Sequence, residues 1–209
     1  MLYGEFPLPL PGAPAPRRNP AAPPRQSIGA WLGLTVLALL LPGLVHAAEG
    51  DRVRGDIAGA NPAGVSGPQV EGTVSMEETA SGVMLVAIEV SGLEPGRHVV
   101  HVHRTGECDA EGGFKSAGGH LAADREHGVR NAPGPHPGDL PNLHAGDDGR
   151  AAVEYFAHGL SLTPGAETSV LDEDGAALVI HAGADDYRSA PAGAAGDRVA
   201  CAVLEPTGA

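Results

Sequence analysis

The chain has 209 residues and a formal net charge of −13, with 26 acidic residues against 13 basic ones. A chain this acidic is a poor partner for nucleic acid, whose phosphates attract basic surfaces. Aromatic residues make up only 3%, whereas the 31 glycines and 19 prolines favour short strands joined by turns over long helices.

The amino-terminal part has a composition unlike the rest. Residues 1–26 carry eight prolines and no hydrophobic periodicity, so we expect a disordered extension. Residues 27–48 resemble a secretory signal peptide: three arginines precede an apolar run, and His46-Ala47-Ala48 offers a cleavage point. An uncleaved membrane anchor is the alternative, because the apolar run is close to the minimum length for a span.

The signal-like segment predicts where the rest of the chain is located. Arginines on its amino-terminal side favour export of the remaining residues, so we expect a periplasmic or otherwise exported protein with no stable membrane association after cleavage. Residues 49–209 have the length of a single domain.

Alternating and apolar segments predict the strands of this domain. The stretch from Asp51 to Gly67 alternates weakly and contains Pro62, so no first strand can be assigned there. The predicted strands are Gln69–Met76, Val83–Val90, Arg97–His103, Ala151–Phe156, Ala176–Ile180 and Arg198–Leu204. Turn signals between them predict an all-β sandwich or barrel.

The two cysteines of the chain, Cys108 and Cys201, are predicted to pair, because an exported protein with an even number of cysteines normally forms disulfides. Their bond would tie the loop after residue 103 to the last strand. Two free buried cysteines are the alternative.

Six of the ten histidines lie between His98 and Asp139. His101 and His103 are separated by one valine, and a strand directs residues i and i+2 to the same face. Two imidazoles on one face can reach a single ion at about 2 Å, which is half of a metal site.

A long loop supplies further metal ligands. Glycines and prolines crowd the stretch that follows residue 117, which predicts a loop rather than a helix or strand. Within it, three imidazoles and one carboxylate would form the closed tetrahedral set that zinc favours in structural sites. These residues are His120, His127, His136 and Asp139.

His181 ends an apolar strand, and a single histidine in such a place is more typical of a surface residue than of a ligand. Five motifs that occur in order along the chain favour a role for His181 as a ligand: HVHRTGEC, SAGGH, HPGDLPNLH, IHAGADDYRS and AGDRVAC. Together they resemble the copper/zinc superoxide dismutases, especially the exported bacterial branch, from about Gln69 to Leu204. The resemblance implies a Greek-key β-sandwich or flattened barrel of about eight antiparallel strands, with two long loops carrying two metals.

The resemblance also implies a role for individual residues. Copper would be held by His101, His103, His120 and His181, and zinc by His120, His127, His136 and Asp139. His120 would bridge the two ions through its two ring nitrogens. Asp185 would hydrogen-bond the outer nitrogens of His101 and His127, and Cys108–Cys201 would be the family's disulfide. His98, His144 and His158 match no ligand position.

The implied activity is superoxide disproportionation. Copper would cycle between Cu(II) and Cu(I), oxidising one superoxide to dioxygen and reducing a second to peroxide with the uptake of two protons. In the family mechanism the bridging histidine, here His120, releases copper and takes up a proton in the reduced state.

The alternatives are a non-catalytic copper- and zinc-binding module on the same fold and a purely structural zinc-stapled domain. The resemblance allows a homodimer.

The substrate anion must approach an acidic domain, so positive charge is needed near copper, within a Debye length of about 8–10 Å. Arg198 matches the arginine that receives the substrate in the family, and Lys115 and Arg104 are weaker candidates for the same positive patch.

Overall fold

The computed structural model describes residues 52–60 and 69–207. The predicted extension (1–26) and signal segment (27–48) lie outside these residues. Within the described part of the chain, no helix is long and apolar enough to cross a membrane.

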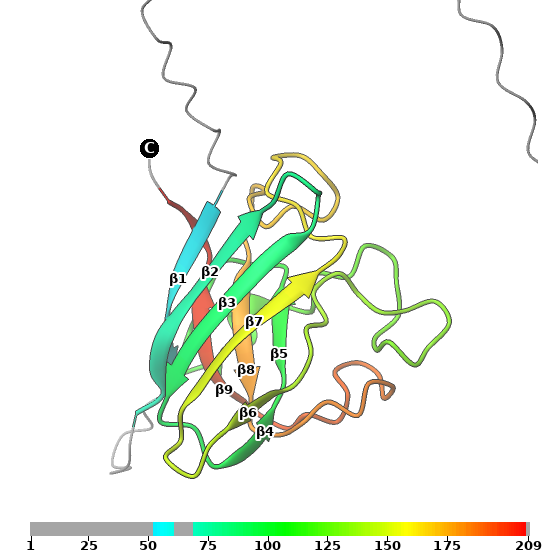
Figure 1. Cartoon of the computed structure of the whole chain (residues 1–209). Coiled ribbons are helices and arrows are strands. Elements are labelled where there is room, and N and C mark those ends of the chain that lie inside the picture. Colours follow the sequence, from blue (N-terminus) through cyan, green and yellow to red (C-terminus); the bar gives the residue numbers. More distant parts are fainter. Residues whose placement is uncertain (1–51, 61–68, 208–209) are drawn as a thin grey trace, which may run out of the picture. The chain divides into compact units, whose positions relative to one another are not determined.

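The regular secondary structure of the described residues consists almost entirely of strands joined by loops (Figure 1). The only helical element there is one 3₁₀ turn, η1 (Lys115–Ala117). The strands are β1 (Arg52–Gly59), β2 (Glu71–Glu78), β3 (Met84–Ser91), β4 (Gly96–His98), β5 (Val100–His103), β6 (Leu143–Ala145), β7 (Ala151–Ala157), β8 (Ala177–His181), β9 (Arg198–Val203) and β10 (Glu205–Pro206).

Eight strands form one antiparallel sheet in the order β5-β8-β9-β1-β2-β3-β7, with β10 paired to β1, while β4 and β6 form a separate pair. The sheet curls so that β1, β2, β3 and β7 form one layer and β5, β8 and β9 lie behind it (Figure 1). The chain leaves β3, crosses to β5 at the opposite edge and later returns to pair β7 with β3. The predicted fold of antiparallel strands in a flattened barrel is confirmed.

The core lies between the two layers and follows from the alternation of the strands. In β3, Met84, Val86, Ile88 and Val90 are buried at every second position, as a strand with one face in a core requires. Inward residues of the other strands join the same apolar cluster, among them Val74, Met76, Leu178 and Ile180.

Strand β1 could not be assigned from the residue pattern, and the structure explains why. Its inward positions are Val53, Gly55, Ile57 and Gly59, so half of the inward residues lack a side chain. A Cβ on Gly55 would lie 2.5 Å from the carbonyl oxygen of Val203. Close approach of the last strands therefore requires glycine where hydrophobic alternation would demand an apolar side chain.

The predicted strand Arg97–His103 is wrong in its extent, because the structure divides it into two. β4 pairs with β6, and β5 pairs with β8. Val99, between them, donates its N–H to the Gly183 carbonyl at 2.9 Å and accepts from His181 N at 3.0 Å. The short strands β6 and β10 are not predicted by the sequence pattern.

The free edge of β5 is covered by the long loop that precedes β6. Isolated bridges join His101 to Asp139 and His103 to His120. The N–H of Leu121 donates to the Val102 carbonyl at 2.8 Å, and the N–H of Val102 donates to the Gly138 carbonyl at 2.9 Å. Main-chain hydrogen bonds therefore fix this loop along the histidine strand.

A disulfide joins Cys108 to Cys201 across 93 positions of the sequence, as predicted. It attaches the loop that follows β5 to strand β9. Cys201 is buried beside Phe114, Ala177 and Val179 in a second, smaller apolar cluster.

Replacing both cysteines (Cys108→Ala with Cys201→Ala) should lower the free energy of unfolding of the metal-free protein by about 2–5 kcal/mol, because the unfolded chain gains the entropy of a long open loop. Guanidinium chloride unfolding measures this difference. Reduced wild-type protein should unfold at the same midpoint as the variant. Equal midpoints for the variant and the oxidised wild type would contradict a stabilising bond.

Candidate metal centre

One face of β5 and the end of β8 bring three histidines together. In the antiparallel register His101 lies opposite Val179, and His103 lies opposite Ala177. Side chains directly opposite each other share a face, and His181 lies two positions beyond Val179, so all three rings share that face. The valines of β5 take the other face and enter the main core.

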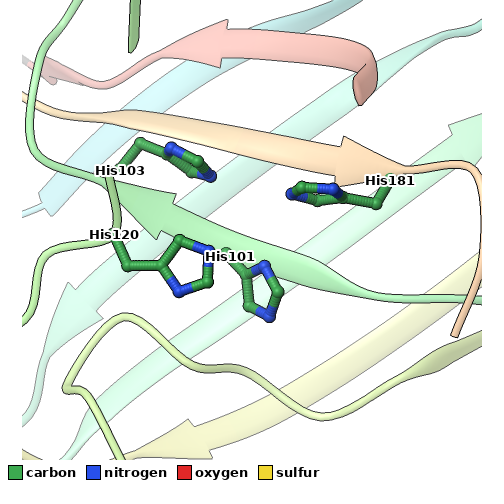
Figure 2. A group of neighbouring side chains, drawn as sticks. All are labelled: His101, His103, His120 and His181. Carbon is green, nitrogen blue, oxygen red and sulfur yellow. The ribbon is translucent and has the colours of Figure 1, made fainter. Parts of the chain in front are cut away.

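His120 completes a first group of potential ligands (Figure 2). It comes from the loop after η1, and its backbone bridges to His103. Ligand atoms of His101, His103, His120 and His181 all lie within 4.8 Å of one another. All four residues are buried: His101 and His103 are 0% exposed, His181 is 3% exposed and His120 is 9% exposed.

The hydrogen bonds of these rings determine which nitrogen remains free. His103 Nδ1 donates to the Gly118 carbonyl at 3.0 Å, and His181 Nδ1 to the Gly196 carbonyl at 3.3 Å. His101 Nε2 lies 3.1 Å from Asp185 Oδ2. Each ring then presents its second nitrogen without a proton, as a metal ligand must.

The described residues contain five buried side-chain N or O atoms without a hydrogen-bond partner. Four are His101 Nδ1, His103 Nε2, His127 Nδ1 and His181 Nε2, and the fifth is the Tyr155 hydroxyl. Unpartnered buried polar atoms are costly, so their concentration on histidines needs a physical reason. A bound metal ion fits, because it accepts the lone pairs that no protein donor reaches.

A second group gathers around the Asp139 carboxylate. Asp139 Oδ1 lies 2.9 Å from His120 Nδ1, 3.2 Å from His127 Nδ1 and 3.0 Å from His136 Nδ1. The other oxygen, Oδ2, accepts the N–H groups of Gly128 and His136 at 2.9 and 3.0 Å. Three imidazoles and one carboxylate oxygen therefore converge, which is a donor set suited to zinc.

The second set of ligand atoms that all lie within 4.8 Å of one another comes from His101, His120, His127 and Asp139. His136 is not in that set, although its Nδ1 lies 3.0 Å from Asp139 Oδ1. The two groups are therefore adjacent and share residues. The ring centroids of His101 and His120 are only 4.0 Å apart.

Asp185 connects the two groups from behind. Its Oδ2 faces His101 Nε2, and its Oδ1 faces His127 Nε2 at 3.0 Å. The N–H of Tyr187 donates to the same Oδ1 at 2.6 Å. A Cβ on Gly193 would overlap with this oxygen, so glycine at position 193 leaves room for the carboxylate.

Burial keeps the first group of histidines neutral. It lowers the pKa of His101 to about 3, of His103 to about 2 and of His181 to about 4, against an ordinary value of 6.5. Burial works against ionisation of Asp185, but hydrogen bonds from His101 and His127 outweigh it and lower the pKa of Asp185 to about 2. Asp139 is likewise buried, and the hydrogen bonds from His120 and Gly128 keep its pKa below the ordinary range. Neutral imidazoles beside ionised carboxylates are the protonation states that metal binding requires.

Arg198 lies beside the first group at the start of β9. Its Nη1 donates to the Phe114 carbonyl at 2.6 Å, and its Nη2 to the Gly118 carbonyl at 2.7 Å. It lines a surface depression of about 950 Å³ together with His181 and Lys115, and also with the acidic Glu111 and Asp197. Arg104 is exposed and is not among the residues that line this depression.

The remaining histidines of the domain do not join either group. His144 and His158 are exposed. His98 is 3% exposed, and its two ring nitrogens lie 2.9 Å from the His181 carbonyl and 2.7 Å from the Glu94 carbonyl. Each ring nitrogen therefore faces a main-chain carbonyl and neither faces the two histidine groups, and the ring lies against the backbone of His181.

The structure brings the four predicted copper ligands together and gathers His120, His127 and His136 around Asp139. Asp185 and Arg198 lie beside these groups. Sequence reasoning missed the carbonyl groups of Gly118 and Gly196, because a main-chain acceptor leaves no mark in the residue type. It also missed Asn142, whose side chain hydrogen-bonds the backbone of Asp185.

Known proteins share both the sequence and the fold. Residues 70–204 match the family model described as copper/zinc superoxide dismutase. The chain is 43% identical over 136 residues to superoxide dismutase [Cu-Zn] 1 of Aquifex aeolicus, covering 64% of this chain and 79% of that protein. It is 42% identical over 137 residues to the superoxide dismutase [Cu-Zn] of Caulobacter vibrioides, covering 64% of this chain and 78% of that protein.

A solved structure of a superoxide dismutase-like protein from Bacillus subtilis aligns with a TM-score of 0.66 at 34% identity, covering 73% of this chain and 97% of the other. Together with the histidine groups and the Cys108–Cys201 bond, these matches show that the chain belongs to the copper/zinc superoxide dismutase family.

Proposed function

We propose that this protein is an exported superoxide dismutase that converts two superoxide anions and two protons to dioxygen and hydrogen peroxide. The observation that carries the proposal is the set of buried nitrogens without partners, His101 Nδ1, His103 Nε2 and His181 Nε2, beside the guanidinium of Arg198. A site for a metal ion next to a cation that can bind an anion suits a small anionic substrate.

His101, His103, His120 and His181 would hold copper, and His120, His127, His136 and Asp139 would hold zinc. Bound copper would supply one-electron chemistry, alternately accepting and donating an electron, while zinc, which has no redox chemistry, would order the loop. His120 turns Nδ1 toward Asp139, which leaves Nε2 for the copper group and for holding a proton during turnover.

Arg198 would attract and orient the anion. Its two hydrogen bonds to main-chain carbonyls fix the guanidinium plane while its charge stays at the depression that His181 also lines. The carbonyl of Gly118 accepts from both Arg198 and His103, so the anion site and a copper ligand share one support.

An exported location agrees with the signal-like segment at residues 27–48 and with the disulfide, because such bonds persist mainly in oxidising compartments.

His101→Ala should reduce disproportionation to the uncatalysed rate, because the variant loses a copper ligand and one partner of Asp185. Pulse radiolysis of protein with measured metal content would test this, with circular dichroism to check that the fold persists. His144→Ala and His158→Ala are the matched controls, since both rings are exposed and belong to neither group, and both should keep full activity.

Wild-type protein that holds both metals yet leaves superoxide decaying at its uncatalysed rate would contradict the enzyme. That result would favour the non-catalytic copper- and zinc-binding module.

Arg198→Met should lower kcat/KM by roughly tenfold or more and make kcat/KM less dependent on ionic strength. Electrostatic steering raises association rates by about 10- to 1,000-fold, and superoxide dismutases are themselves a standard example of it. Arg198→Lys should retain part of the rate, because it keeps the charge but loses the paired hydrogen bonds. Stopped-flow rates across a salt series measure both effects. Arg104→Met is the control and should leave the rate unchanged; an equal loss in Arg104→Met would refute a special role for Arg198.

The metal-free protein should lose stability as the pH falls from about 6.5 towards 4. His101, His103 and His181 have folded-state pKa values of about 3, 2 and 4, below their ordinary 6.5, so in this range only the unfolded state takes up their protons. Between pH 7 and pH 5 each should contribute a loss of roughly 1–2 kcal/mol.

Urea unfolding of the chelator-treated protein at several pH values measures this slope. A free energy of unfolding that stays constant between pH 7 and pH 5 would show that the three rings are not buried as neutral groups.

A further inference from the structure

We propose, building on the proposed function, that Asn142 is a positioning residue for the metal centre: it fixes the main chain of Asp185 so that one carboxylate reaches His101 and His127 together. Asn142 would touch neither ion. It would act entirely through Asp185.

The contact between the two residues is bidentate. The N–H of Asp185 donates to Asn142 Oδ1 at 2.8 Å, and Asn142 Nδ2 donates to the Asp185 carbonyl at 3.0 Å. One side chain therefore satisfies both main-chain groups of Asp185. In addition, the N–H of Asn142 donates to the Tyr187 hydroxyl at 3.0 Å, two residues further along.

Asp185 needs this support because no strand holds it. It lies between β8 (Ala177–His181) and β9 (Arg198–Val203), in the long loop, yet its carboxylate is buried and must face two rings at once. The distances of 3.1 Å to His101 and 3.0 Å to His127 leave little room for movement before one hydrogen bond fails.

Asn142 obtains its own position from regular structure. It directly precedes β6, which pairs with β4, and in that pair His98 lies opposite Leu143. The chain reaches β5 only one residue beyond β4. The short β4–β6 pair thus connects the strand that carries His101 and His103 with the support of Asp185.

The contact uses an acceptor and a donor on two separate atoms at the end of a short side chain, which is what the amide of asparagine supplies. An aspartate at position 142 would have almost the same shape, but it would place a carboxylate oxygen against the carbonyl oxygen of Asp185. Asn142→Asp is therefore an isosteric variant that removes the donor.

Asn131 offers a matched control within the same two loops. Its Nδ2 donates to the His127 carbonyl at 2.6 Å and to the Arg188 carbonyl at 2.8 Å. It makes as many side-chain hydrogen bonds as Asn142 does, one within its own loop and one to the loop that carries Asp185, but none of them reaches Asp185 itself. A role in loop packing alone would make the two asparagines equivalent.

The test is a double-mutant cycle on zinc affinity in copper-free protein, measured by competition with a chromogenic chelator. Asp185→Asn should weaken zinc binding by about 10- to 100-fold, the usual effect of losing a partner of a ligand. Asn142→Ala and Asn142→Asp should each weaken it by roughly tenfold, but by less than about threefold when Asp185→Asn is already present. Asn131→Ala should have the same effect in both backgrounds.

Cobalt in place of zinc provides a second readout, because its visible spectrum reports ligand geometry. Asn142→Asp should change this spectrum in the same direction as Asp185→Asn does. Undiminished zinc affinity in both Asn142 variants, or an equal loss with and without Asp185→Asn, would overturn the proposal.

These measurements need no superoxide. A wild-type protein without dismutase activity would refute the proposed function and leave the coupling of Asn142 to Asp185 intact, whereas additive effects on zinc affinity would refute the coupling alone.

Discussion

Strand β5 is buried on both faces, and the rest of the molecule is arranged around that constraint. Val100 and Val102 pack into the main core, while His101 and His103 point to the side covered by the long loops. A strand at the edge of a sheet normally exposes main-chain groups. Here the loop from Leu121 to Gly138 hydrogen-bonds to that edge and brings further histidines to it. The pairing that protects the edge therefore also brings the candidate metal ligands together.

Concentrating so many titratable groups in one buried place has an energetic cost that the protein meets in two ways. In each histidine ring of β5 and β8, one nitrogen donates a hydrogen bond to a main-chain carbonyl or to Asp185. The other nitrogen is left free. Burial then keeps these rings neutral. The free lone pairs are unfavourable without a ligand, so an ion bound here would stabilise the folded form of this region.

Much of this could be predicted from the sequence, because it depended on side-chain type and spacing. Alternation identified β2, β3 and β7, and the His-Val-His spacing placed two rings on one face. The residue pattern also predicted the pairing of the two cysteines and identified the loop as a candidate metal-binding segment. The features that stayed hidden depend on the main chain. β1 was missed because close packing put Gly55 and Gly59 at inward positions, and the division at Val99 depends on which strand each half pairs with.

The carbonyl of Gly118 accepts one hydrogen bond from His103 and another from Arg198. It belongs to the segment that the Cys108–Cys201 bond attaches to the barrel. A displacement of that segment would therefore disturb both the proposed copper site and the proposed anion site. A substitution that reshapes this segment would affect both properties together. We therefore expect fewer tolerated substitutions in this segment than in other irregular loops of the domain.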